Sequence, residues 1–97
     1  MVTYVSLLKF TEQGFKQIKD SPKRLDAYAK AAKAAGVKLT AAYYTMGEYD
    51  LVLVNDAPDE EALLKVLLAQ LSYGNVTSTT MRAFPPSKMK ELLQEPS

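Results

Sequence analysis

Asp50 is the residue of this chain with the clearest capacity for chemistry, because it is an acidic residue at the start of the apolar run 51–54. Two phenols, Tyr4 and Tyr44, lie on strands that we expect to be in the same sheet. A carboxylate in a cavity beside phenols could act as a base or anchor a ligand. In this functional interpretation Asp50 is the candidate catalytic residue, and it projects into a cavity on an uncovered face of the sheet.

Asp50 also has a structural interpretation, in which it follows a hairpin turn and fastens it. Its carboxylate would then accept hydrogen bonds from backbone amides or pair with Arg82. Gly47 would supply the positive φ of the turn, and Tyr49 would cover it. The sequence leaves both interpretations open.

The candidate ligand-binding set is Tyr4, Ser6, Tyr44, Asp50 and Arg82. The chain contains neither histidine nor cysteine, and these residues make the common zinc sites, the His-ligated haem site and the His-based triads. We therefore expect no metal site and no cofactor.

Composition indicates an ordinary globular protein with one domain over residues 1–97, since 47% of the residues are hydrophobic and 24% are charged. Twelve basic and eleven acidic residues are interleaved and give a formal net charge of +1. A balance of this kind does not favour nucleic acid or an anionic membrane as a partner. The amino-terminal residues resemble no signal peptide, and no apolar run approaches the roughly 20 residues of a membrane span. A cytoplasmic location is the default expectation.

Local signals predict four strands and two long helices. The predicted strands cover residues 3–9, 37–45, 49–55 and 76–84, each rich in β-branched or aromatic residues. A helix begins at Ser21, the expected cap, with Pro22 at its first position, and ends at Gly36. A second helix follows the acidic stretch 59–61 and ends at Gly74, and a short last helix follows an expected cap at Ser87.

The order β-α-β-β-α-β indicates an α+β fold, the ferredoxin-like βαββαβ arrangement with a four-stranded antiparallel sheet. Right-handed crossovers place both helices on one face of the sheet and leave the other face open. From strand alternation we expect one set of side chains to meet the helices: Val5, Leu7, Leu39, Ala41, Leu51 and Leu53. We expect the other set to line the open face: Tyr4, Ser6, Leu8, Thr40, Ala42, Tyr44, Asp50, Val52 and Val54.

The chain resembles the GYD domain family, which is named for a Gly-x-Tyr-Asp signature. The signature is matched by Gly47, Glu48, Tyr49 and Asp50, and the stretches IKDSPKRL, YTMGEYDLVLV, APDEE and GNVTSTTMRAF resemble the family in the same order. The resemblance implies a ferredoxin-like domain of the dimeric α/β-barrel type. It implies no particular activity.

An open face that carries both valines and polar groups predicts a partner, because monomers rarely expose large apolar patches. We expect a homodimer or a higher oligomer, with a small-molecule ligand held at the interface or with a regulatory or structural role. The alternative is a cofactor-independent isomerase or monooxygenase of the dimeric barrel type that uses Asp50 and a tyrosine.

Overall fold

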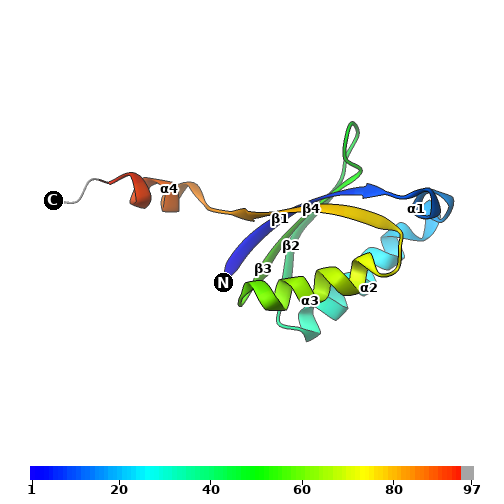
Figure 1. Cartoon of the computed structure of the whole chain (residues 1–97), viewed down its shortest axis with the longest axis horizontal. Coiled ribbons are helices and arrows are strands. Elements are labelled where there is room, and N and C mark those ends of the chain that lie inside the picture. Colours follow the sequence, from blue (N-terminus) through cyan, green and yellow to red (C-terminus); the bar gives the residue numbers. More distant parts are fainter. Residues whose placement is uncertain (95–97) are drawn as a thin grey trace.

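A computed structural model of the chain describes residues 1–94 and shows one antiparallel sheet with two long helices against one face (Figure 1). The strands lie in the order β2-β3-β1-β4. The four strands are β1 (Val2–Phe10), β2 (Lys38–Tyr44), β3 (Leu51–Ala57) and β4 (Val76–Ala83). The helices are α1 (Glu12–Lys16), the 3₁₀ turn η1 (Ile18–Asp20), α2 (Ser21–Ala34), α3 (Glu60–Leu71) and α4 (Pro86–Leu93).

The predicted α+β architecture is confirmed: the order of the elements is βαββαβ, with a four-stranded antiparallel sheet and a C-terminal helix. Figure 1 shows α2 and α3 on the same side of the sheet, while the loop between β2 and β3 projects on the other side. The middle strands are β3 and β1, and the edge strands are β2 and β4.

Side-chain caps form at two of the helix starts. Thr11 accepts a hydrogen bond from the amide of Gly14, and Asp59 accepts one from Ala62, so each satisfies a free backbone donor of its helix. The caps expected at Ser21 and Ser87 are wrong. The hydroxyl of Ser21 instead bonds the hydroxyl of Tyr44 at 2.8 Å, a contact between elements that local sequence does not reveal.

The third strand begins and ends two residues later than the sequence predicts, at Leu51 and Ala57. Residues 49 and 50 lie outside the strand because they complete the hairpin loop. Asp50 is thus a loop residue at the entrance of β3, and not a strand residue.

The predicted assignment of β1 to the two sheet faces is wrong. Register pairs Ser6 with Leu53 and Leu8 with Leu51, so these four side chains share one face. That face is the one the helices cover, since all four residues are buried. The sequence alone placed β1 one residue out of phase with β3, and this error moves every side chain of the strand to the opposite face.

The second strand contains an irregularity, so its side chains do not simply alternate between the two faces of the sheet. Its register shifts between Leu39 and Ala41, so that Thr40 is an extra residue. After this bulge Ala42 pairs with Leu53 and Tyr44 with Leu51, which places both on the helix-covered side. Ala41, expected to meet the helices, lies on the open side opposite Val54.

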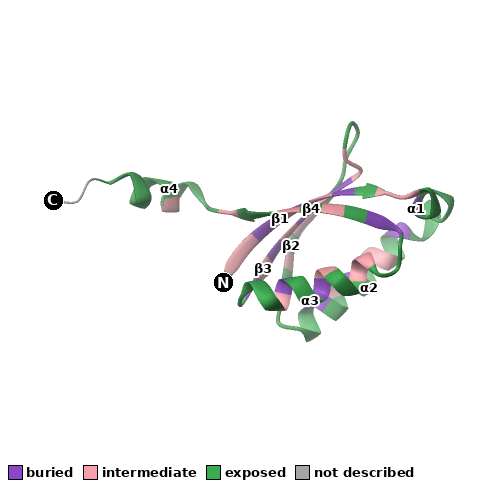
Figure 2. Ribbon diagram, viewed as in Figure 1, coloured by how far each residue is buried: buried purple, intermediate pink, exposed green. Residues whose placement is uncertain are grey.

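The core lies between the sheet and the two long helices. Tyr28 and Ala32 of α2 and Leu63 and Val66 of α3 pack against buried strand residues. Figure 2 shows the buried segments where the sheet and these helices face each other.

Helix α4 lies apart from this core, at the end of an arm that continues from β4 (Figure 1). It contains no buried residue, and Figure 2 shows it almost entirely exposed. The apolar side chains of Met89, Leu92 and Leu93 are 52%, 61% and 73% exposed. Because of this arm, the molecule is 57 Å long in its longest dimension. No helix within residues 1–94 combines the length and the hydropathy needed to span a membrane.

Candidate functional site

The signature residues 47–50 form the end of the hairpin between β2 and β3. Gly47 has a φ of 108°, a value that residues with a side chain rarely adopt. A Cβ atom at this position would meet no other atom within 4 Å. The backbone conformation, and not the available space, therefore explains the glycine.

Asp50 fastens this hairpin to the end of β1 through both its backbone and its side chain. Its amide donates to the carbonyl of Leu8 at 2.8 Å, and its carboxylate Oδ2 accepts from the amide of Phe10 at 2.9 Å. Its own carbonyl accepts from the amide of Thr45 at 2.9 Å, which closes the loop. The carboxylate thus takes the place of a strand carbonyl where the hairpin leaves the sheet.

The other signature residues contact the residue between those two anchor points, Lys9. The ammonium group of Lys9 lies 5.3 Å from the centre of the Tyr49 ring and 3.8 Å from the Glu48 carboxylate. Both charged side chains are largely exposed, so the ion pair contributes little. Thr45 donates its hydroxyl to the carbonyl of Tyr49 at 2.6 Å. The signature is therefore surrounded by contacts that shape the turn.

The phenol expected beside Asp50, Tyr4, lies far from it and on the helix-covered face. Tyr4 pairs with Asn55, so it is roughly 16 Å from Asp50 along the strands at about 3.3 Å per residue. Its side chain is buried, and its hydroxyl has no hydrogen-bond partner among the described residues. Burial raises the pKa of this hydroxyl, and the nearby negative charge of Glu60 raises it further.

Two other members of the predicted set hold neighbouring elements together. Tyr44, on the helix-covered side, bonds Ser21 at the start of α2. Ser6 is buried and bonds Thr80 of β4 at 2.8 Å. Both hydroxyls are therefore occupied by contacts within the chain.

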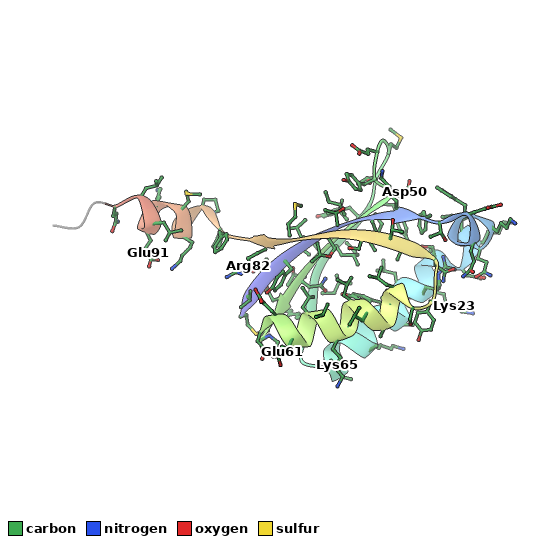
Figure 3. All side chains as sticks on the ribbon, viewed as in Figure 1. Lys23, Asp50, Glu61, Lys65, Arg82 and Glu91 are labelled. Atoms are coloured by element: carbon green, nitrogen blue, oxygen red, sulfur yellow. The ribbon has the colours of Figure 1, made fainter. Side chains whose placement is uncertain are left out.

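Arg82, the last member of the set, lies at the other end of the sheet from Asp50. Its guanidinium group is 4.3 Å from the centre of the Phe84 ring and 5.9 Å from that of Tyr4. It also donates to the carbonyl of Thr3 at 3.4 Å. Figure 3 shows Asp50 and Arg82 well separated, and the pairing of the two that the sequence suggested does not occur.

The structure thus brings Tyr4 and Arg82 together and keeps both apart from Asp50 and Tyr44. Sequence reasoning missed the buried bond from the Tyr28 hydroxyl to Asn55 Oδ1, which is 3.0 Å long. The polar Asn55 within an otherwise apolar strand was the available signal, since a buried amide requires a partner. No cluster of three potential metal-ligating side chains occurs in residues 1–94.

The second candidate site is the open face of the sheet, opposite to α2 and α3. Register places Val5 beside Val54 and Met81, and Leu7 beside Val52 and Thr79. Tyr43 extends this surface from β2 and is 66% exposed, while Met81 extends it from β4 and is 43% exposed. We call this surface the open face and define it by these residues: Val5, Leu7, Ala41, Tyr43, Val52, Val54, Thr79 and Met81. The prediction that Val52 and Val54 lie on the open side is confirmed.

Comparison with known proteins gives one curated relative and one solved structure, both from Thermus thermophilus. The chain is 29% identical over 86 residues to the glutamine synthetase and cystathionine beta-lyase binding protein of this bacterium, a match that covers 88% of this chain and 90% of that protein. The crystal structure of TTHA0845 from the same organism is similar with a TM-score of 0.57 and 25% identity, over 88% of this chain and 95% of that one.

The model of the GYD domain matches residues 4–93, which is nearly the whole chain and includes the hairpin that Asp50 fastens. The resemblance inferred from residues 47–50 is therefore confirmed, and this chain belongs to the GYD domain family.

Proposed function

We propose that this chain is a binding module that forms a homodimer through its open face and binds a metabolic enzyme through its C-terminal arm. One observation carries the proposal: within residues 1–94, no other part of the chain covers two apolar surfaces, the open face and α4. Apolar surfaces of this extent on soluble proteins mark interaction sites.

The open face suits a second copy of itself. Val5, Leu7, Val52 and Val54 are half-buried by their neighbours, and the face carries no charged residue at its centre. Two such faces can stack about 10 Å apart and interdigitate their side chains, as sheets do in sandwiches. A two-fold axis through the centre of the face makes the surface complementary to itself.

Helix α4 lies apart from the open face, at the end of the arm, and its shape suits a protein partner. It is a short amphipathic helix on an extended arm, with Leu92 and Leu93 exposed. Amphipathic helices commonly bind by placing their apolar side in a groove of another protein. The Thermus relative is named for binding glutamine synthetase and cystathionine beta-lyase. We propose an enzyme of this kind, one that handles amino acids, as the partner.

The alternative, a cofactor-independent enzyme, requires a carboxylate and a phenol at one cavity. Asp50 is bonded to the backbone of Phe10, Tyr4 is on the far side of the sheet, and Tyr44 is bonded to Ser21. No observation favours this function over a binding role.

Light scattering tests the dimer, with Val54→Glu as the variant and Leu64→Glu as its control. Leu64 is 52% exposed on α3, so it matches Val54 as an accessible apolar residue outside the open face. We expect a mass of at least twice 10.7 kDa for the wild type and the control, and the monomer mass of 10.7 kDa for Val54→Glu. A monomeric wild type, or a dimer that only Leu64→Glu dissociates, contradicts the proposal.

Calorimetric titration into purified glutamine synthetase and cystathionine β-lyase of the source organism tests the arm. Leu92→Glu should abolish binding, whereas Lys90→Glu on the same helix should retain most of it. Neither residue is buried, so the fold is not at risk. Binding of neither enzyme by the wild type, or equal binding by both variants, contradicts the role of α4.

A further inference from the structure

A groove of about 400 Å³ lies between α2 and α3, on the side of the molecule away from the open face. Its small lining residues on the α2 side are Ala27, Ala31 and Ala35, the C-cap of α2, and they follow one another at intervals of four residues on one side of the helix. Ala69 lies on the α3 side. These side chains are too small to fill the space between the helices, which leaves the groove open.

The polar groups around this groove are cationic or neutral. Arg24 of α2 and Lys65 of α3 (the latter labelled in Figure 3) both line it, and its other polar lining residues are Tyr28, Gln70, Tyr73 and Asn75. None of the lining residues is acidic. The local charge therefore favours an anion, although the net charge of the whole chain is only +1.

Arg24 has hydrogen-bonding capacity that the chain itself does not use. Its Nη1 donates to the carbonyl of Gln17 at 2.9 Å, but its Nη2 is buried and has no partner among the described residues. Arg24 lines the groove, and a carboxylate there would supply a charge-assisted bond to its flat, forked guanidinium group. The hydroxyl of Tyr28 is already bonded to Asn55, so Tyr28 offers the groove only its ring.

We propose that the groove between α2 and α3 binds a small organic carboxylate with an apolar body. The carboxylate contacts Arg24, with Lys65 contributing positive charge, and the apolar body lies over the alanines and the ring of Tyr28. The volume falls in the range of small-molecule sites and has room for on the order of ten non-hydrogen atoms, at about 30 Å³ each. This site shares no residue with the open face or α4, so it does not depend on the proposed function.

The test is a nuclear magnetic resonance titration of the full chain with sodium octanoate, and with octanol and octylammonium as neutral and cationic analogues. We expect octanoate to shift the backbone amides of residues 24–35 and 65–75. Octanol should bind roughly tenfold more weakly, because it lacks the charge-assisted bond, and octylammonium should cause no shifts. Shifts confined to the open face, or equal affinities for octanoate and octanol, overturn the proposal.

Two variants locate the site, and a third is the control. Arg24→Gln should weaken octanoate binding roughly tenfold, and Ala31→Trp should abolish it by filling the groove. Ala31 and Lys30 are exposed, so neither Ala31→Trp nor the control Lys30→Gln disturbs the core. Unchanged affinity in Arg24→Gln overturns the proposal. A second result also overturns the proposal: octanoate shifts no backbone amide of the groove, and Ala31→Trp dissociates an oligomer. The groove is then an interface between copies of the chain.

Discussion

Both faces of the sheet carry apolar side chains, but the exposure of these side chains differs between the faces. On the covered face Leu8, Leu51 and Leu53 are at most 6% exposed, because α2 and α3 pack on them. On the open face Val5, Leu7, Val52 and Val54 are only half-buried, and Tyr43 and Met81 are exposed. The comparison teaches that an apolar composition does not distinguish a covered face from an uncovered face in this fold. The position of the helices does.

Two neighbouring residues of β3 test the difference between the faces most directly. Leu53→Ala on the covered face should lower the free energy of unfolding by about 2 to 5 kcal/mol, because it leaves a cavity in a packed core. Val52→Ala, one residue away on the open face, should cost less than about 1 kcal/mol in dilute solution. Chemical denaturation measures both. Similar losses for the two variants in dilute solution would contradict the assignment of the faces, whereas a Val52→Ala loss that grows with protein concentration would support pairing of the open faces.

Asp50 lies in the loop at the entrance of β3, and one substitution separates its two interpretations. Asp50→Asn should cost about 1 to 3 kcal/mol, since the bond to the Phe10 amide loses its charge assistance. For a chain of this length that lowers the melting temperature by roughly 4 to 20 °C. Glu48→Gln, which affects only an exposed ion pair, should cost less than about 0.5 kcal/mol. An Asp50→Asn variant that melts at or above the wild-type temperature, while losing a co-purifying ligand, would favour the functional interpretation.

Two tyrosines on the covered side, one with a hydrogen-bonded hydroxyl and one without such a bond among the described residues, allow a matched test in which we expect smaller changes in stability. Tyr28→Phe should cost about 1 to 3 kcal/mol, because it leaves the buried Asn55 carbonyl oxygen without its partner. Tyr4→Phe should leave the melting temperature unchanged or raise it, because the hydroxyl that it removes has no hydrogen-bond partner within residues 1–94. Thermal unfolding followed by circular dichroism measures both variants. A Tyr4→Phe variant that melts well below Tyr28→Phe would indicate a hydrogen bond of Tyr4 that the structure does not contain.

The same two residues predict how stability changes in alkali. Burial raises the pKa of both hydroxyls above the ordinary value of 10.0, while in the unfolded chain they ionise near it. The folded chain therefore binds more protons above pH 10.0, and the free energy of unfolding falls as the pH rises further. Below pH 10.0 this contribution of the two hydroxyls to the free energy of unfolding is fully present. Urea denaturation above pH 10.0 should show this fall in the free energy of unfolding. The double variant Tyr4→Phe with Tyr28→Phe should show a smaller fall. An equal fall in the double variant would mean that other groups cause it.

The sequence by itself determined the elements and their order. Gly47 indicated a turn with positive φ, and the acidic stretch 59–61 indicated a helix start. The leucines between that stretch and Gly74 repeat at helical spacing. These signals are local, since each depends on the backbone conformation of a few adjacent residues. Residues 47–50, together with the longer stretches that resemble the family in the same order, suggested the family.

Only the tertiary structure decided which side of each strand became the core and what each site residue touches. Alternation sorts a strand into two sets of side chains, but the pairing of β1 with β3 and the bulge at Thr40 determine which set the helices cover. Likewise, the carboxylate of Asp50 meets the amide of Phe10 forty positions away because the hairpin closes against the end of β1. Such contacts depend on register and crossover geometry, and no spacing in the sequence contains that information.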